Sequence, residues 1–159
     1  TASDLVEMML AQYQFETSDL DYGPAQEKDL SRYDILKIAS MIEREAYIPE
    51  ERELISAVIH NRLDIGMALG IDATLTYFLQ KWDQPLTESD LETDTPYNTR
   101  IYSGLPPTPI CNPGLASIKA ALQPADVDYL YFVVTDSQTH EHSFTDDYNE
   151  HLENIRNAK

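Results

Sequence analysis

The sequence has few cysteines, glycines and basic residues, and each shortage excludes a class of protein. Its single cysteine, Cys111, rules out a disulfide framework within the chain and a metal site built from several cysteines. Five glycines leave no phosphate-binding loop of the GxxxxGK(S/T) kind, and no serine lies in a GxSxG turn. Lys and Arg number 11 against 28 Asp and Glu, a net charge of −17 that argues against nucleic-acid partners and anionic membranes.

Long hydrophobic runs are also missing. The longest uncharged stretch, residues 101–118, contains Pro106, Pro107, Pro109 and Pro113, so it cannot form a membrane-spanning helix. The chain begins at Thr1 rather than Met, and we therefore expect an excerpt whose targeting or anchoring segment lies upstream. A length of 159 residues suits one domain with an appended helix.

Apolar spacing divides the chain into an N-terminal part and a main body. Residues 3–14 have a helical period, with Ser3 as the expected cap. Residues 16–30 are acidic and contain a Gly-Pro pair, which is typical of a linker or an exposed loop. The sequence thus predicts an N-terminal helix and acidic linker over residues 1–30 and a main domain over residues 31–159.

The main body reads as several helices and one hairpin. Ser31 and Asp34 form an approximate capping box for a helix over 31–46, and Pro49 begins another that should end in a left-handed cap at Gly66. Further helices are expected after caps at Asp72, Asn112 and Thr145. Strands are expected at 129–134 and 142–144. These elements predict an α+β fold, predominantly helical with a small antiparallel β-sheet.

Two glutamates on the helix over 31–46 are candidates for acid–base chemistry. At 100° per residue, Glu43 and Glu45 lie about 80° to either side of the centre of the apolar stripe, while Arg44 faces solvent. A carboxyl group at such a shoulder is partly desolvated, which raises its pKa as a general acid requires. Helix geometry does not choose between the two, and both could equally be ordinary boundary residues.

Other candidate sites are weaker. His140 and His142 share a strand face that His151 could approach, as in a zinc site, but no metal-binding spacing accompanies them and they could instead form a polar rim. Cys111 has no local base and is expected to be a small loop residue rather than a nucleophile. The stretch from Tyr97 to Gly114 combines aromatic, amide and hydroxyl groups with prolines, as sugar-binding loops do, although a structural crossover would look the same.

A series of short motifs follows in order through residues 31–155. They are Ala39-Ser40-Met41-Ile42-Glu43-Arg44-Glu45, Asn61-Arg62-Leu63 with Gly66-Met67, Asp72 with Thr74 and Tyr77, Thr95-Pro96-Tyr97-Asn98-Thr99, Gly104-Leu105-Pro106-Pro107, Asn112-Pro113-Gly114, Asp128-Tyr129-Leu130-Tyr131-Phe132-Val133, His142-x-Phe144 and Glu150-His151. Together they resemble the endolytic murein transglycosylase family (MltG, or YceG-like). The ordered set, rather than any single motif, carries the resemblance.

The resemblance implies a catalytic domain over 31–159 that cleaves peptidoglycan glycan strands by a lytic transglycosylase reaction. The family's catalytic glutamate falls on Glu45, which would protonate the bond between N-acetylmuramic acid and N-acetylglucosamine and leave 1,6-anhydro ends. Neither a cofactor nor a metal is implied. The implied location is the extracytoplasmic face of a bacterial membrane, reached through an N-terminal anchor missing from this excerpt, with cell-wall synthesis proteins as candidate partners.

A substrate groove around Glu45 is expected from residues spread along the sequence. The expected substrate-binding residues are Asn61, Asp72, Tyr97, Asn98, Asn112 and His142. Two alternatives stay open. One is a glycoside hydrolase that uses Glu45 with Asp72 as the second carboxylate, and the other is a glycan-binding module without catalysis.

Overall fold

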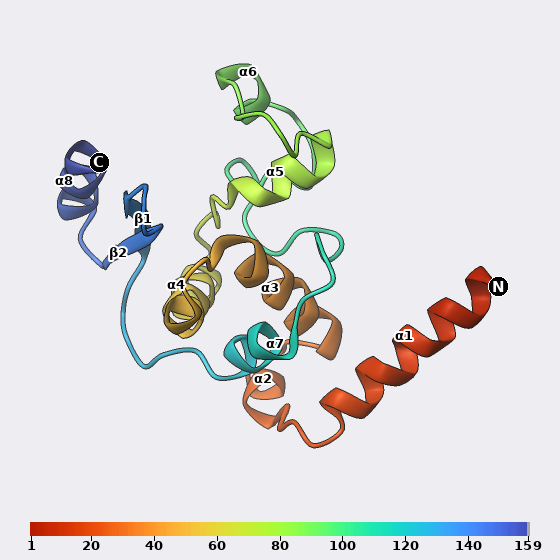
Figure 1. Cartoon of the computed structure of the whole chain (residues 1–159). Coiled ribbons are helices and arrows are strands. Elements are labelled where there is room, and N and C mark those ends of the chain that lie inside the picture. The colour runs from red at the N-terminus through yellow and green to blue at the C-terminus, as the bar shows by residue number, and fades with distance from the viewer. Residues whose placement is uncertain (159) are drawn as a thin grey trace.

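The computed structural model describes residues 1–158 as eight α-helices, one 3₁₀ turn and one two-stranded sheet (Figure 1). The elements are α1 (Ala2–Thr17), α2 (Gly23–Glu27), α3 (Arg32–Glu45), η1 (Pro49–Glu51), α4 (Arg52–Asp64), α5 (Asp72–Leu79), α6 (Glu88–Leu91), α7 (Leu115–Leu122), β1 (Tyr131–Asp136), β2 (Glu141–Thr145) and α8 (Tyr148–Asn157). The predicted α+β class is confirmed. Lys159, the last residue of the expected main domain, lies outside the described residues.

Helix α3 forms the centre of the core. Its apolar stripe is fully buried, and Ile35, Ile38 and Ile42 are each no more than 1% exposed. The helix packs against α7, α4 and α5. The capping box of Ser31 and Asp34 is confirmed, with each side chain bonded to the other residue's backbone N–H. Burial therefore fixes which side of α3 faces inward and where its last turn, at Glu43–Glu45, points.

The sheet is a single antiparallel hairpin. Strand β1 pairs with β2 so that Phe132 lies opposite Phe144 and Val134 opposite His142, with a bulge before Asp136. Helix α8 packs against both strands. The first strand begins two residues later than predicted, at Tyr131. The carbonyls of Tyr129 and Leu130 accept hydrogen bonds from side chains of α4, at Asn61 and Arg62, although the Leu130 N–H still donates to the Thr145 carbonyl. The hairpin and α8 form one arm of the molecule, at the left of Figure 1.

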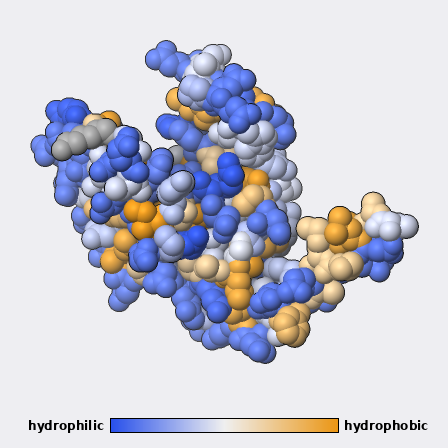
Figure 2. Space-filling model, viewed as in Figure 1, coloured by the Kyte–Doolittle hydropathy of each residue, from blue (hydrophilic) through white to orange (hydrophobic). Residues whose placement is uncertain are grey.

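A second arm is formed by α5, α6 and the loops around them, at the top of Figure 1. The space-filling view shows a cleft between the two arms whose surface is largely hydrophilic (Figure 2). Helix α1 extends away from the body on the other side, and its apolar side chains give the orange patch at the right of Figure 2. Among residues 1–158, no helix combines the length and apolar character needed to cross a bilayer.

The predicted linker over 16–30 is in part wrong. Residues 23–27 form the short helix α2, and Tyr22 and Ala25 are buried in the core. These apolar side chains cover one end of the α3 stripe, so the segment packs as part of the domain rather than as an exposed loop. The acidic composition and the Gly23-Pro24 pair predicted a loop. They gave no indication that two apolar residues of the segment would be buried.

Five helix starts differ from the predictions. The helix expected from Pro49 begins with the 3₁₀ turn η1, and α4 itself starts at Arg52. Helix α1 is capped by Thr1 in a capping box with Asp4, rather than by Ser3. Helix α5 includes Asp72 as its first residue, after Ile71. Helix α8 is capped by Asp147, with Thr145 bonded to the Asp147 N–H. Helix α7 begins after Gly114 rather than Asn112, and the Gly114 N–H donates to a carboxylate from α3.

Candidate active site

The cleft between the two arms contains a cavity of about 440 Å³. Its walls come from α3, α4, α5, the loop after Asn98, the hairpin and α8. The lining residues are Glu45, Arg62, Leu69, Gly70, Asp72, Arg100, Phe132, Val133, Val134, His142, His151 and Ile155. A cavity of this size can hold one or two sugar rings, with charged groups at one side and the hairpin's apolar side chains at the other.

Glu45 is the last residue of α3 and reaches the cavity from the core side. Burial raises the pKa of its carboxyl group from an ordinary 4.5 to about 7, and the nearby negative charge of Asp72 adds to the rise. A hydrogen bond from the Ala73 backbone N–H and the charge of Arg44 lower it by less. A carboxyl group in this range is present in both forms near neutrality, as proton donation followed by proton uptake requires.

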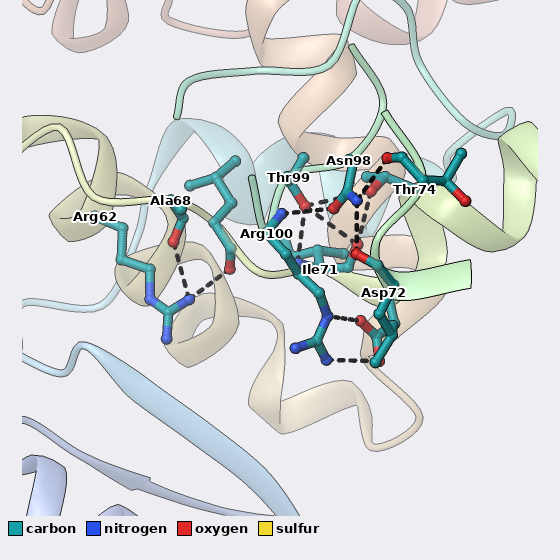
Figure 3. A network of polar contacts seen from close by, with 11 residues as sticks. Arg62, Ala68, Ile71, Asp72, Thr74, Asn98, Thr99 and Arg100 are labelled. Atoms are coloured by element: carbon teal, nitrogen blue, oxygen red, sulfur yellow. Dashed lines mark hydrogen bonds and ion pairs between the residues drawn. The ribbon is translucent and has the colours of Figure 1, made fainter. Parts of the chain in front are cut away.

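Asp72 is held at the cavity by a bidentate ion pair. Arg100 donates from Nε to Oδ1 at 2.6 Å and from Nη2 to Oδ2 at 3.0 Å (Figure 3). Such a fork fixes the plane of the carboxylate and offsets its charge. Asp72 therefore lies close enough to Glu45 to affect its protonation while being engaged by a cation of its own.

A buried polar network places this ion pair. The Ile71 N–H donates to Thr99 Oγ1 at 2.9 Å, and Thr74 Oγ1 donates to the Ile71 carbonyl at 2.7 Å. Asn98 Oδ1 accepts the Arg100 N–H at 3.1 Å. Figure 3 shows these residues joining the start of α5 to the loop that carries Arg100. The network thus connects two segments 28 residues apart and sets the position of Asp72 relative to Arg100.

His142 lines the cavity from β2, with a carboxylate bonded to it. Glu51 Oε2 lies 2.6 Å from His142 Nδ1, and Glu51 Oε1 accepts the His142 backbone N–H at 2.9 Å. Both residues are buried, with 6% of Glu51 and 8% of His142 exposed. The imidazole ring lies against Phe132 and Phe144. One ring nitrogen is thus bound to Glu51 while the residue itself lines the cavity.

The two shoulder glutamates of α3 have different surroundings. Glu43 Oε2 accepts hydrogen bonds from Ser117 Oγ at 2.6 Å and from the Gly114 N–H at 3.2 Å. It therefore connects α3 to the start of α7, on the side of the helix away from the cavity. Of the two residues that helix geometry left equivalent, only Glu45 lines the cavity.

The structure brings together only part of the predicted substrate groove. Asp72 and His142 line the cavity with Glu45, whereas Asn61, Tyr97, Asn98 and Asn112 do not. The Asn61 amide donates to the carbonyls of Val127 and Tyr129, at 2.8 and 2.9 Å.

The remaining three residues have surroundings of their own. The Asn98 amide is fully buried and donates to two loop carbonyls, at Leu91 and Thr93. Tyr97 bonds to Thr108, and Asn112 lines a separate pocket together with residues of α1. The two asparagine amides therefore hold backbone in place, and the Asn61 pair fixes the chain that leads into β1.

The other candidates from the sequence have separate environments. His151 lines the cavity and stacks on Tyr131, and burial together with the charge of Arg62 lowers its pKa. His140 instead packs against Tyr47, with ring centres 4.2 Å apart. Within residues 1–158, no group of three or more His, Cys, Asp or Glu side chains is arranged to hold a metal ion. Burial raises the pKa of the Cys111 thiol, which disfavours the nucleophilic thiolate.

Sequence reasoning assigned no role to Arg62, Arg100 or Glu51. Arg62 donates to the carbonyls of Ala68, Leu69 and Leu130, and its guanidinium lies over the Tyr131 ring. Arg62 lies inside a motif noted above, next to Asn61, and Arg100 directly follows the motif that ends at Thr99. Nothing in the sequence distinguished Glu51, because it is one of 28 acidic residues and lies in a polar turn.

Comparison with known proteins agrees with the motif order. The model of the YceG-like family matches residues 1–157, almost the whole chain. The chain belongs to the YceG-like family. The resemblance inferred from the ordered motifs is thereby confirmed, and the match includes α1 and α2 as well as the main body.

Relatives of this YceG-like chain include named enzymes and a solved structure. An endolytic murein transglycosylase of Bacillus subtilis (strain 168) is 43% identical over 104 residues, which make up 65% of this chain and 29% of that protein. One of Streptococcus pneumoniae (strain ATCC BAA-255 / R6) is 31% identical over 166 residues, covering 100% of this chain and 30% of its own length. The 2.6 Å crystal structure of a yceG-like protein from Listeria monocytogenes matches with a TM-score of 0.77 and 35% identity, over 94% of this chain and 46% of that one. The chain therefore spans about 30% of the length of these transglycosylases.

Proposed function

We propose that this chain is the catalytic part, over residues 31–159, of an endolytic lytic transglycosylase that cuts peptidoglycan glycan strands. The observation that carries the proposal is the position of Glu45, a carboxyl group with a pKa of about 7 in the wall of a sugar-sized cavity. The names of the related proteins support the substrate class.

The proposed reaction uses one carboxyl group twice. Glu45 donates its proton to the oxygen that joins N-acetylmuramic acid to N-acetylglucosamine, and the bond from that oxygen to the muramic C1 breaks. The muramic C6 hydroxyl oxygen then bonds to C1 and gives its proton to the Glu45 carboxylate. The enzyme returns to its starting state, no water is consumed, and the muramic product ends in a 1,6-anhydro ring.

Asp72 bears on the choice between this reaction and hydrolysis. A hydrolase needs a second carboxylate free to attack C1 or to activate water. Both oxygens of Asp72 accept hydrogen bonds from Arg100. This engagement favours a role for Asp72 in tuning Glu45 and supports the single-carboxyl route over the hydrolase alternative.

The substrate also suggests where the protein works. Peptidoglycan lies outside the cytoplasmic membrane, so we place the activity at the extracytoplasmic face of a bacterial membrane. Proteins of cell-wall synthesis act on the same strands at that face and are the partners we propose. Asp72 and His142 are the proposed substrate contacts, because both line the cavity with Glu45.

Digestion of purified peptidoglycan sacculi tests the proposal. Soluble fragments ending in 1,6-anhydromuramic acid, one water lighter than hydrolysis products, are expected by mass spectrometry. Glu45→Gln should release almost none, whereas Glu43→Gln provides a matched control on the same helix turn. Reducing ends would establish hydrolysis instead, and glycan binding without any fragments would indicate a binding module.

A further inference from the structure

Glu51 and His142 form a buried pair that connects two distant parts of the chain. Glu51 lies in η1, directly after α3, and His142 lies in β2, 91 residues later. Both carboxylate oxygens of Glu51 are used on His142, one by its backbone N–H and one by its ring Nδ1. The carboxylate therefore fixes the ring relative to the backbone of its own strand.

This geometry selects a protonation pattern of the imidazole. A carboxylate oxygen can only accept, so the Nδ1 atom at 2.6 Å must carry the hydrogen. In the neutral ring, the unprotonated nitrogen is then Nε2. Among the described residues, no group forms a hydrogen bond with Nε2. Nε2 is also absent from the fully buried polar atoms that lack a partner, so the protein does not enclose it. Since His142 lines the cavity, Nε2 is the ring atom available to a ligand there.

Packing alone does not account for the pair. The imidazole already packs against Phe132 and Phe144, which hold the ring by apolar contact. A buried carboxylate has a large desolvation penalty, and apolar residues of similar volume are commonly as stabilising as a buried polar pair. What an apolar replacement could not supply is a defined acceptor atom on the cavity wall.

We propose that Glu51 is a positioning residue that holds His142 in the Nδ1–H form, so that Nε2 accepts a hydrogen bond from a hydroxyl group of the sugar bound beside Glu45. This inference rests on the proposed function for its ligand. Both residues line the same cavity, Glu45 from the end of α3 and His142 from β2, so the sugar would meet both. Glu51 touches no substrate and acts through the imidazole.

Glu51→Gln gives a sharp test because an amide cannot satisfy both contacts. If its oxygen accepts the His142 backbone N–H, its NH₂ group faces Nδ1 and favours the Nε2–H form. Glu50→Gln is the matched control, since Glu50 is adjacent, exposed and carries the same charge. Nitrogen-15 NMR of the histidine rings reports the tautomer, and thermal unfolding checks that both variants fold.

We expect Nδ1–H in the wild type and in Glu50→Gln, and Nε2–H in Glu51→Gln. Activity of Glu51→Gln on sacculi should fall roughly 10- to 100-fold, the range found when partners that orient metal-binding imidazoles are removed. Binding of purified glycan strands, measured in a Glu45→Gln background, should weaken in the same variant. Glu50→Gln should leave both unchanged.

Two results would overturn the inference. One is a wild-type His142 protonated on Nε2, and the other is a Glu51→Gln variant whose tautomer changes while glycan binding and activity do not. Failure of the proposed function has a different signature, because it appears as a lack of fragments from the wild-type protein. The tautomer and binding measurements need no turnover and therefore separate the two.

Discussion

Asp72 lies beside Glu45 in the cavity, and its negative charge adds to burial in raising the Glu45 pKa to about 7. Arg100 engages both oxygens of Asp72 and so sets how much of that charge reaches Glu45. The candidate acid is thus tuned by two neighbours of opposite sign, and each can be changed separately.

Glu45→Gln should reduce the rate of glycan cleavage by at least roughly 100-fold, because the amide keeps the shape and loses the transferable proton. Glu43→Gln should retain substantially more activity, since this side chain lies away from the cavity and the Gln amide oxygen can still accept the bonds from Ser117 and Gly114. Its main effect should be a loss of about 1–2 kcal/mol in the free energy of unfolding. Fragment release and urea unfolding measure the two effects. An inactive Glu43→Gln beside an active Glu45→Gln would reverse the assignment.

Asp72→Asn should lower the Glu45 pKa, because the like charge that raises it is gone and Arg100 is left as a free cation. The protonated fraction at pH 7 then falls, and activity there should drop roughly 5-fold if the pKa falls by one unit. The pH profile of kcat/KM should show its alkaline limb moved to lower pH. A variant with no activity at any pH would instead point to Asp72 as a second catalytic carboxylate.

Arg100→Met should have the opposite effect. Asp72 then keeps its charge without a counterion, so the Glu45 pKa rises further and the alkaline limb moves to higher pH. Because the pair is half exposed, the change in unfolding free energy should stay below about 1 kcal/mol. Lys119→Met, which removes an exposed cation on α7, is the control and should leave the profile in place. This account would be contradicted if the alkaline limbs of the pH profiles of Arg100→Met and Asp72→Asn shifted in the same direction.

Glu45 should also make the protein less stable as pH rises. Its folded pKa of about 7 exceeds the ordinary 4.5, so between these values the native state binds more protons than the unfolded state. Wild type and Glu45→Gln should be equally stable near pH 4. Above pH 7 the variant should be more stable by up to about 3 kcal/mol, the full difference between the two pKa values. Chemical unfolding at pH 4 and pH 8 measures this, and a variant less stable at pH 8 would refute it.

Asn61→Ala should act on stability rather than on substrate affinity. The Asn61 amide donates to two carbonyls before β1, at Val127 and Tyr129, and both lose their partner in the variant. A loss of about 1–3 kcal/mol in unfolding free energy is expected. KM for glycan strands should change little under conditions in which the variant is folded. A raised KM with unchanged stability would restore the substrate-binding role expected from the sequence.

Local rules predicted much of the fold. The capping box of Ser31 and Asp34, the buried stripe of α3 and the positive φ of Gly66 all depend on residues within one or two turns of each other. The hairpin was predicted for the same reason, although its first strand began late. Before that start, the carbonyls of Tyr129 and Leu130 bond to side chains of α4, a contact that no local pattern contains.

The candidate site depended on contacts that no local rule contains. Helix geometry found two shoulder positions on α3 but could not say which faced a cavity, because that depends on where α5 and α7 pack. The pairing of Glu51 with His142 spans 91 residues, and that of Asp72 with Arg100 spans 28. The chain has 28 acidic residues, and tertiary packing determines which few of them contact a buried partner. Asn61 and Asn98 show the converse. Both were expected to bind substrate, but their amides donate to backbone carbonyls instead.

The bonds from Glu43 to the start of α7 have a mechanical consequence for the other end of the same turn. Together with the buried stripe, these bonds hold the rotation of α3 about its own axis. With side chains roughly 5 Å from the helix axis, a rotation of about 20° would swing the Glu45 carboxylate by about 2 Å. Displacements of about 1 Å are enough to slow an enzyme markedly. The angular setting of the acid is therefore held from the face of the helix that never meets the sugar.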